Sequence, residues 1–224
     1  MGLTARRLAR WPLTATLVVG MTCISVFHIA APADAADVVG EAPAYQIGDE
    51  WHFSAGVYPG TVRVVAVQGE QTVTEFAGNT RCDGCRAYRD TNLTVLKVLD
   101  ARGEPWAEAD LNARYLDLPL QVGKEWKQDI NLHSGDGGVY SYRNRLVVEA
   151  YEQVKVKAGT FWAFRIKQYQ QATMSNWTGS RLSWWAPAVR GWVRFECWRA
   201  SPGSRTSFCR DTELELYRLA SAAQ

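Results

Sequence analysis

The feature of this sequence that most constrains its fold is a heptad that occurs twice. Residues 46–52 read QIGDEWH, and residues 121–127 read QVGKEWK. Both copies follow the pattern glutamine, β-branched apolar residue, glycine, charged residue, glutamate, tryptophan, polar residue. Each copy precedes a glycine-containing turn region and then a run of residues that favour strands, at 62–67 and 146–150. The repetition predicts a duplicated β unit.

Alternating apolar and polar residues indicate strands in the rest of the chain. Between residues 160 and 170, Trp162 and Phe164 share one face, whereas Arg165 and Lys167 point to the other. A period of two is typical of a strand with one buried face and one wet face. Such runs, separated by turns, predict an all-β fold: an antiparallel curved sheet that closes into a barrel or half-barrel, with at most one short helix.

The chain divides into an export segment and one β domain. The predicted organisation is a cleavable signal peptide at 1–35, a flexible arm at 36–44, a single β domain at 45–219 with pseudo-repeats at about 45–118 and 119–219, and a tail at 220–224. Strands are expected at about 49–56, 61–68, 71–77, 86–100, 124–131, 139–150, 152–157, 160–171, 180–186, 190–199, 205–211 and 213–219. A turn or short helix is expected within 104–116.

The first 35 residues have the pattern of a secretory signal peptide. Three arginines lie among the first ten residues, and the run 11–31 contains no aspartate, glutamate, lysine or arginine. Residues 33–35 form a small-x-small cleavage site, which makes Ala36 the expected new N-terminus. The alternative is an uncleaved membrane anchor, because the run is nearly long enough to span a bilayer.

The net positive charge of the chain comes from its export segment. Removing residues 1–35 takes away Arg6, Arg7, Arg10 and Asp34 from a total of 25 basic and 23 acidic residues, so 22 of each remain. A neutral chain lacks the positive field that nucleic acids and anionic membrane surfaces require. We therefore expect no nucleic-acid partner, no transmembrane segment in the mature chain, and a periplasmic or secreted location in a bacterial cell envelope.

Four cysteines remain after the predicted cleavage, an even number that favours disulfides in an exported protein. We predict the pairs Cys82–Cys85 and Cys197–Cys209. Asp83-Gly84 is a strong signal for a tight hairpin turn, and such a turn places its flanking residues opposite each other within disulfide reach.

Two other uses of these cysteines are open. A thioredoxin-like redox pair at Cys82 and Cys85 requires a strand that leads into a helix, and the flanking residues favour a hairpin instead. A zinc site requires all four thiolates, but Cys197 and Cys209 lack the close spacing of zinc ligands. Covalent haem attachment is excluded, because Arg86 stands where that motif has histidine.

The sequence contains no strong catalytic motif. Only His52 and His133 remain after export, and neither has neighbours at the spacing of metal ligands. Nucleophile elbows, zinc-protease helices and phosphate-binding loops are absent from the sequence. We therefore expect a protein that is not an enzyme and that needs no cofactor and no metal.

Aromatic side chains are the candidates for ligand binding. Trp184 and Trp185 are adjacent, so on a strand they must point to opposite faces, and either a second layer covers one of them or it is exposed. The two heptad tryptophans either pack in the core or face each other across a ligand cavity. The candidate ligand-binding residues are Trp51, Trp126, Trp162, Phe164, Trp184 and Trp185.

Four segments of the chain resemble a family of exported bacterial β proteins of unknown function. They are GDEW at 48–51, LPLQVGKEW at 118–126, VKVKAGTF at 154–161 and WWAP at 184–187, and the resemblance extends over most of 45–218. It implies a curved antiparallel sheet, loosely similar to the lipoprotein-carrier half-barrel that holds acyl chains. These motifs consist of turn and core residues, so the resemblance implies a fold and no catalytic residue.

The sequence leads to three hypotheses of function. The first is a non-enzymatic exported protein that binds a lipid or another apolar or amphipathic small molecule in the concavity of its sheet. The second is a structural or interaction protein that contacts an envelope protein through a tryptophan-rich surface at 177–198. The third is a thiol oxidoreductase that uses Cys82 and Cys85.

The signal peptide gives the first testable prediction. Cells that export the full-length chain should release a protein that begins at Ala36, because signal peptidase cuts after a small-x-small site. Intact-mass measurement and N-terminal sequencing of the exported protein check this. A mass that includes residues 11–31 would instead establish an uncleaved anchor.

Overall fold

The computed structural model describes residues 37–54, 60–79, 82–106, 111–133, 138–200 and 211–221. All of them lie in one compact unit that comprises residues 31–224. The strands are β1 (Glu50–Phe53), β2 (Gly60–Gln68), β3 (Gln71–Ala77), β4 (Arg86–Arg89), β5 (Val95–Leu99), β6 (Glu125–His133), β7 (Val139–Val156), β8 (Gly159–Ala172), β9 (Thr178–Ala186), β10 (Gly191–Phe195), β11 (Arg199–Ala200) and β12 (Thr212–Arg218). A single turn of 3₁₀ helix, η1 (Pro187–Val189), is the only helix in these residues.

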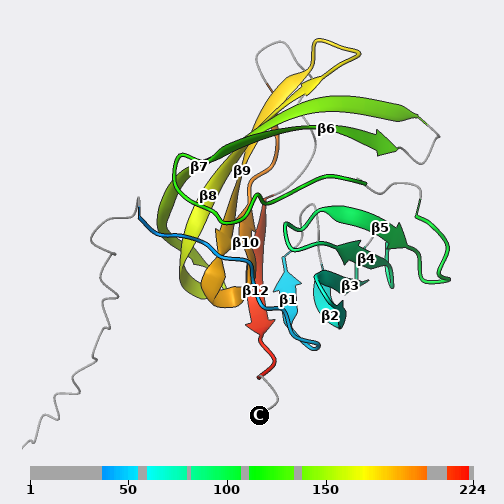
Figure 1. The fold of residues 1–224 in the computed structure, drawn as a ribbon, viewed down its shortest axis with the longest axis vertical. Helices are drawn as coiled ribbons and strands as arrows, with labels where there is room; N and C mark the ends of the chain where they lie inside the picture. Colours follow the sequence, from blue (N-terminus) through cyan, green and yellow to red (C-terminus); the bar gives the residue numbers. More distant parts are fainter. Residues whose placement is uncertain are drawn as a thin grey trace, which may run out of the picture. The chain divides into compact units, whose positions relative to one another are not determined.

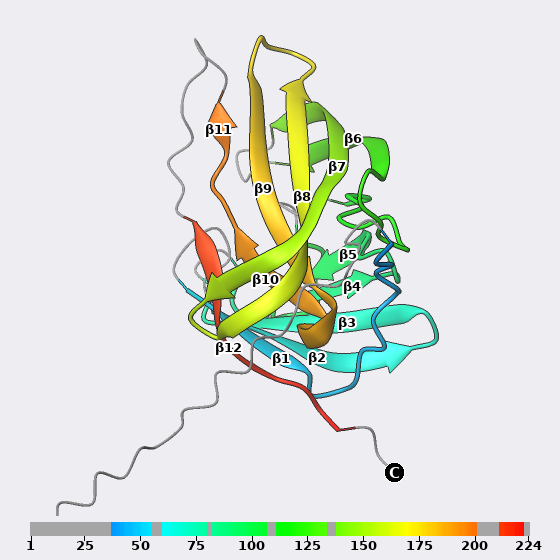
Figure 2. The ribbon, with the colours of Figure 1, turned by 90° about the vertical axis from the view of Figure 1, so that its left-hand side faces the viewer.

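The strands form one curved antiparallel sheet of twelve strands (Figure 1). Their order is β5-β4-β3-β2-β1-β12-β10-β9-β8-β7-β6, and β11 pairs with β9 outside this path. The chain therefore starts in the middle of the sheet, runs to one edge, crosses to the other edge and returns (Figure 2). The predicted all-β antiparallel curved sheet is confirmed, and strand pairing leaves it open between β5 and β6.

The two heptads begin their strands with the same turn. Gly48 and Gly123 both have positive φ, 95° and 89°, a conformation that glycine adopts without strain. The Gly48 N–H donates to the Val64 carbonyl (2.9 Å), and the Gly123 N–H donates to the Val148 carbonyl (2.8 Å). The N–H of each valine donates in return to the backbone carbonyl of the residue that follows the heptad glycine (2.8 Å for Val64 and 2.9 Å for Val148). The heptads thus have matching local geometry, while duplication of the whole unit stays a prediction.

The strands that face the two heptads also match. β2 shifts register between Val64 and Ala66, and β7 does so between Val148 and Ala150. Each shift lies directly after the valine that pairs with the heptad turn. A bulge at this place bends the strand, so both long hairpins curve at equivalent positions.

The curved sheet buries both of its faces, in separate clusters. Trp184 is 5% exposed and packs with Trp51 and Leu214, whereas Trp185 is 1% exposed and packs with Phe164 and Trp126. Strand geometry sends adjacent side chains to opposite faces, so two buried tryptophans in sequence require packing on each side of β9. A second layer therefore covers the tryptophan that an isolated sheet would expose.

Residues 111–118 bridge the two edge strands. On the β5 side, the Val95 N–H donates to the Ala113 carbonyl (3.3 Å), and the Val95 carbonyl accepts the Asn112 N–H (2.8 Å). On the β6 side, the Arg114 N–H donates to Gln128 Oε1 (2.7 Å), and Gln128 Nε2 donates to the Arg114 carbonyl (2.9 Å). This segment, which we call the strap, pairs with the backbone of the β5 edge and binds the β6 edge through the Gln128 side chain.

The segment before the first heptad packs against the strap's end. Gly40 and Leu120 exchange two backbone hydrogen bonds of 2.8 Å each, and Val38 contacts the cluster around Trp185. A Cβ atom built on Gly40 would lie 2.6 Å from the Phe164 ring, so only glycine fits between the ring and Leu120.

Several predicted element bounds were wrong. The single strand expected at 86–100 is two strands, because the Asp90 carboxylate accepts the N–H groups of Asn92 (2.9 Å) and Thr94 (2.8 Å) and closes a turn. The two strands expected at 139–150 and 152–157 are one strand, β7, which bulges without ending.

Two further predictions concern irregular segments. The described part of 104–116 contains turns and no helix, and the strand expected at 205–211 falls almost wholly outside the described residues. The described part of the chain also contains no helix with the length and apolar character that a membrane span requires.

The strap gives a second prediction. Gln128→Ala removes both bonds to Arg114 and should lower the free energy of unfolding by about 1–2 kcal/mol. Urea denaturation measures the loss, and hydrogen exchange at the Arg114 amide should accelerate. Asn131→Ala is the matched control, because Asn131 also lies in β6 but accepts only an exposed bond from Ser141 (2.6 Å). Equal losses in the two variants would show that the strap does not depend on Gln128.

Candidate functional site

A cavity of about 230 Å³ lies on the interior face of the first five strands. Its walls also include parts of β9 and β10, the turn after η1 and the strap. Most of the lining residues are aromatic or aliphatic, and the polar ones include three arginines. The lining residues are Tyr45, Trp51, Phe53, Val62, Thr72, Thr74, Phe76, Asn79, Cys82, Cys85, Ala87, Arg89, Leu93, Val95, Val98, Trp106, Tyr115, Arg181, Arg190, Gly191, Trp192 and Phe195.

Strand register gives this cavity two ends. Thr72 pairs with Arg89, which pairs with Val95, so these residues form a row at one end. Phe76 lies four residues further along β3, where its N–H donates to the Cys85 carbonyl (2.9 Å). A strand rises about 3.3 Å per residue, so the two rows are about 13 Å apart along β3.

The Arg89 side chain reaches from its own row toward Phe76. Arg89 Nη1 donates to the Thr74 hydroxyl, and its guanidinium carbon lies 5.6 Å from the centre of the Phe76 ring. Tyr45 is within electrostatic reach of both Arg89 and Arg190. Burial raises the pKa of Tyr45 above its ordinary value and the Asp49 carboxylate adds to the rise, while Arg89 and Arg190 oppose it only in part. The phenol is therefore a neutral hydrogen-bond donor at any physiological pH.

A buried carboxylate holds Arg190, another arginine of the lining. Asp49 is fully buried and accepts Arg190 Nη1 at 2.9 Å. The same carboxylate accepts the N–H of Gln46 (3.0 Å) and the N–H of Ala220 (2.8 Å). Asp49 thus connects the first heptad turn, the turn after η1 and the segment that follows β12 through its hydrogen bonds. Its charge is compensated inside the protein, as a buried carboxylate requires.

Trp51 lines the cavity and contacts Tyr45. Its indole N–H donates to the Val189 carbonyl (2.7 Å), and its ring packs edge-on against Tyr45 with centroids 5.9 Å apart. Gly191 lies against the same ring, and a Cβ atom there would come within 2.8 Å of Trp51 Nε1. Glycine at 191 therefore lets β10 approach the indole closely.

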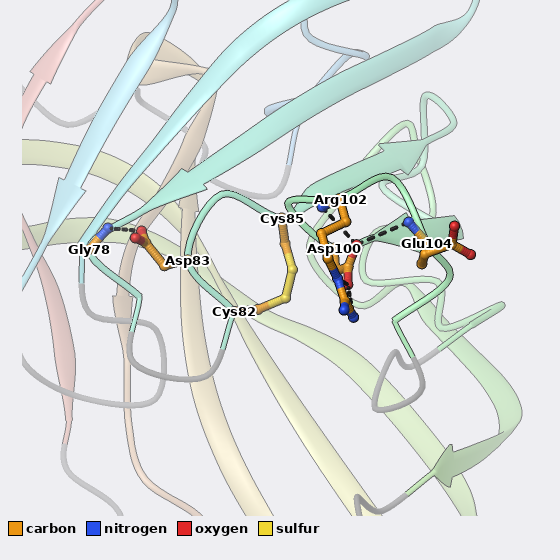
Figure 3. Close-up of a disulfide and its surroundings, with 7 residues drawn as sticks. All are labelled: Gly78, Cys82, Asp83, Cys85, Asp100, Arg102 and Glu104. Atoms are coloured by element: carbon orange, nitrogen blue, oxygen red, sulfur yellow. Dashed lines mark hydrogen bonds and ion pairs between the residues drawn. A yellow bond between two sulfur atoms is a disulfide. The ribbon is translucent and has the colours of Figure 1, made fainter.

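A disulfide lies beside Phe76 in the cavity wall. Cys82 and Cys85 are joined across the tight turn at Asp83-Gly84, with their Cα atoms 5.4 Å apart (Figure 3). Asp83 fixes this turn by accepting the Gly78 N–H (2.7 Å). The Cys85 side of the disulfide is buried, so it contributes apolar surface to the cavity wall.

A second turn positions Trp106 near this disulfide. Asp100 accepts the N–H groups of Arg102 (2.8 Å) and Glu104 (3.0 Å), as Figure 3 shows. The bond from Glu104, with the contribution of Arg102, holds the pKa of Asp100 below its ordinary value. The turn brings the Trp106 N–H onto the Val98 carbonyl (3.0 Å). This part of the cavity wall is thus built from two carboxylate-stabilised turns.

The third arginine of the lining lies on β9. Arg181 Nε donates to Gln168 Oε1 (2.9 Å), and its guanidinium stacks 4.9 Å from the centre of the Trp198 ring. Two residues after Arg181 on β9, Ser183 pairs with Phe195. Phe195 pairs in turn with Thr212, which lies two residues before the Leu214 that pairs with Phe53. This succession puts Arg181 on the Phe53 side of the cavity, away from Arg89.

The structure separates the aromatic residues that the sequence singled out. Only Trp51 lines the cavity. Trp126, Phe164 and Trp185 share one buried cluster, and Trp184 belongs to the other. Trp162 is half-buried and stacks on Tyr151, with ring centroids 5.5 Å apart.

Sequence reasoning missed the polar residues of the cavity: Tyr45, Arg89 and Arg190. The available signal was the alternation in β4, which puts Arg89 on the same face as Ala87, the buried face. A long cationic side chain on a buried face is uncommon unless it has a partner. Arg190 carried no such signal, because its position depends on the distant Asp49.

The remaining cysteines and the possible metal ligands form no second site within the part of the chain that the structure describes. Cys197 is disulfide-bonded, and its predicted partner, Cys209, lies outside the described residues. Within the described residues, no three of the His, Cys, Asp and Glu side chains form a group that could hold a metal ion.

No protein-family model matches this chain, and no curated protein matches it in sequence. Among solved structures, it is similar to the hypothetical lipoprotein YmcC of Escherichia coli K12, with 12% identity, a TM-score of 0.47, and 81% of this chain and 90% of that chain covered. It is also similar to a candidate exported protein with a YmcC-like fold from Bacteroides fragilis, with 15% identity, a TM-score of 0.45, and 81% and 100% covered.

A third similar structure is a candidate lipoprotein of Parabacteroides distasonis, with 13% identity, a TM-score of 0.43, and 81% of this chain and 100% of that chain covered. The three descriptions are of lipoproteins and exported proteins of bacteria.

Asp49 gives a third prediction. Asp49→Ala should lower the free energy of unfolding by about 3 kcal/mol, because it leaves a guanidinium and two backbone N–H groups without their acceptor. Chemical denaturation measures the loss. Glu215→Ala is the control, since it removes only an exposed ion pair with Lys157 and should cost less than about 1 kcal/mol. A loss below 1 kcal/mol for Asp49→Ala would contradict its role as the tie between three segments.

Proposed function

We propose that this chain is an exported, non-enzymatic protein that binds an apolar or amphipathic small molecule in the cavity on the interior face of β1–β5. The observation that carries the proposal is the cavity itself, with its wall of aromatic and aliphatic side chains. Burial of apolar ligand surface against such a wall is favourable in proportion to the area removed from water.

The size of the cavity suits a small molecule or a short segment of an acyl chain. An apolar cavity of about 150 Å³ is enough to bind benzene, and this one measures about 230 Å³. Native packing leaves few voids larger than a water molecule. A space of this size on the apolar face of a sheet therefore supports occupation by a ligand.

The chemistry of the lining supports binding rather than catalysis. The described residues that line the cavity include no carboxylate and no histidine to serve as a general base. The hydroxyl groups are those of Thr72, Thr74 and two tyrosines, and the two cysteines are consumed in the disulfide.

The other two hypotheses draw less support from the described residues. Trp184 and Trp185 are buried, so a tryptophan-rich contact surface would have to do without them. Trp177 and Trp198 pack against each other, with ring centroids 5.9 Å apart. A thioredoxin-like cysteine needs a helix N-terminus, whereas Cys82 and Cys85 flank a hairpin turn and the described residues contain no α-helix.

Export belongs to the same proposal. The first 35 residues have the pattern of a signal peptide. A structural disulfide between Cys82 and Cys85 persists in the oxidising periplasm or outside the cell and not in the cytosol. Both observations support a periplasmic or secreted location.

Filling the cavity tests the proposal. Ala87 is 1% exposed and lies in the middle row of the cavity wall, opposite Thr74 and Val98. Ala87→Leu should weaken binding of decanol at least about tenfold, as measured by isothermal titration calorimetry, because the added side chain occupies the ligand's space. Native mass spectrometry of the periplasmic protein should show a retained lipid-sized mass that the variant lacks.

The matched control is Thr160→Leu, which adds apolar bulk at an exposed position of β8. It should bind decanol as the unmodified protein does. Thermal unfolding of both variants checks that each is folded. A folded Ala87→Leu protein that binds decanol normally, or an unmodified protein that binds none, would overturn the proposal.

A further inference from the structure

We infer that β6 pairs with β6 of a second copy of this chain, and that the two strands run antiparallel about a two-fold axis at Gln128. β6 is the last strand on its side of the sheet (Figure 1). The strap reaches it through the side chains of Trp126 and Gln128, so the strap forms no backbone ladder with it. A strand edge with unpaired backbone groups is a template for another strand. The inference concerns a partner and does not depend on the cavity of β1–β5.

The ladder between β6 and β7 determines which backbone groups of β6 point outward. The Val148 N–H donates to the Lys124 carbonyl (2.9 Å), in the register that also pairs Glu125 with Val147. Bonded pairs of an antiparallel ladder recur at every second residue. The even-numbered residues of β6 therefore bond to β7, and the N–H and C=O groups of the odd-numbered residues point away from it. Within the described part of the chain, nothing bonds to these outward groups.

β6 lacks two of the features that natural proteins use to block a sheet edge. It contains no proline, and its register with β7 continues without a bulge over all nine residues. It does carry three exposed charged side chains, those of Glu125, Lys127 and Asp129, which alternate in sign along the strand. A second strand is therefore repelled in some registers and attracted in others.

These charges favour one register of a symmetric pair. A two-fold axis at Lys127 or at Asp129 would put two like charges directly opposite each other. An axis at Gln128 instead puts Lys127 opposite Asp129 of the second copy, and this pair occurs twice. It also puts Glu125 opposite Asn131 of the second copy. Opposite charges directly across a strand pair are stabilising, and like charges are destabilising.

An axis at Trp126 is the competing register. It would pair Glu125 with Lys127 of the second copy, but the overlap within β6 would shrink to residues 125–127. The Glu125 carboxylate is also already occupied, because it accepts Arg145 Nη2 at 2.6 Å. The axis at Gln128 keeps residues 125–131 paired and leaves the Glu125–Arg145 ion pair intact.

The two charges that would meet lack strong counter-charges in a single copy. The Lys127 side chain is 76% exposed, and its ammonium lies 3.9 Å from the Glu125 carboxylate, which Arg145 already engages. Lys127 also lies opposite Arg145 in the strand register. Asp129 is exposed and makes no hydrogen bond or ion pair within the described residues. A Lys127–Asp129 contact between copies would supply each of them with a counter-charge.

The assembly should be a weak dimer that does not grow further. Trp126 and Ile130 are already buried within one copy, at 5% and 6% exposed, so association would remove little more apolar surface from water. Backbone bonds and exposed ion pairs then hold the copies together, and salt screens the ion pairs. Each copy spends its β6 edge on the two-fold contact, while the strap already pairs with Val95 at the β5 edge.

Charge substitutions test the register. Sedimentation equilibrium of the signal-cleaved protein should show a reversible monomer–dimer equilibrium that weakens as salt is added. Asp129→Lys and Lys127→Asp should each weaken self-association at least about tenfold, because each puts like charges across the contact. A mixture of the two single variants should associate, and so should the double variant. Lys155→Asp is the matched control, since Lys155 is also exposed on a strand but lies in β7 beyond the part that pairs with β6.

Hydrogen exchange tests the backbone contact independently. At concentrations that form the dimer, the amides of Lys127 and Asp129 should exchange more slowly than in dilute protein. The Gln128 amide, which bonds to β7, should exchange at the same rate in both. Protein that stays monomeric at about 1 mM would overturn the inference. A dimer whose double variant fails to associate, or whose Lys127 and Asp129 amides gain no protection, would place the contact elsewhere and refute it.

Discussion

An open antiparallel sheet has two edges with unpaired backbone groups, and the rest of this structure depends on how one segment holds those edges together. The strap at 111–118 bonds to Val95 of β5 through its backbone and to Gln128 of β6 through a side chain. Hydrogen bonds from one short segment thus hold together edges that strand pairing leaves apart. The same segment supplies Leu116, which is fully buried among the side chains of the second half of the sheet.

The two halves of the sheet fill their interiors differently, and this difference creates the cavity. In the second half, Trp126, Phe164 and Trp185 pack into one buried cluster. In the first half, the corresponding face of β3 and β4 carries Thr72, Thr74 and Ala87, whose side chains are small. A curved sheet of similar geometry therefore has a solid core on one side and a hollow on the other. Side-chain volume, rather than strand layout, decides where the cavity lies.

Much of the local structure could be predicted from the sequence. The heptads identified two matching turns, since positive φ at Gly48 and Gly123 needs only local chemistry. Asp83-Gly84 predicted a hairpin that brings Cys82 and Cys85 together for the same reason. The turn at Asp90, which separates β4 from β5, was not predicted. The Asp90 side chain stabilises this turn through hydrogen bonds to nearby backbone groups, and such a local effect changes strand propensity over only a few residues.

The sequence by itself determined the β fold, the turns and the faces of the strands, because period-two alternation and turn residues act through neighbours in the chain. Only the tertiary structure decided which aromatic side chains fill a core and which line a cavity. It also brought Arg190 to the cavity, through an ion pair with a carboxylate that lies 141 positions away in the chain. Such contacts depend on how far each strand bends before it meets its partner, and a local sequence pattern does not predict the extent of that bend.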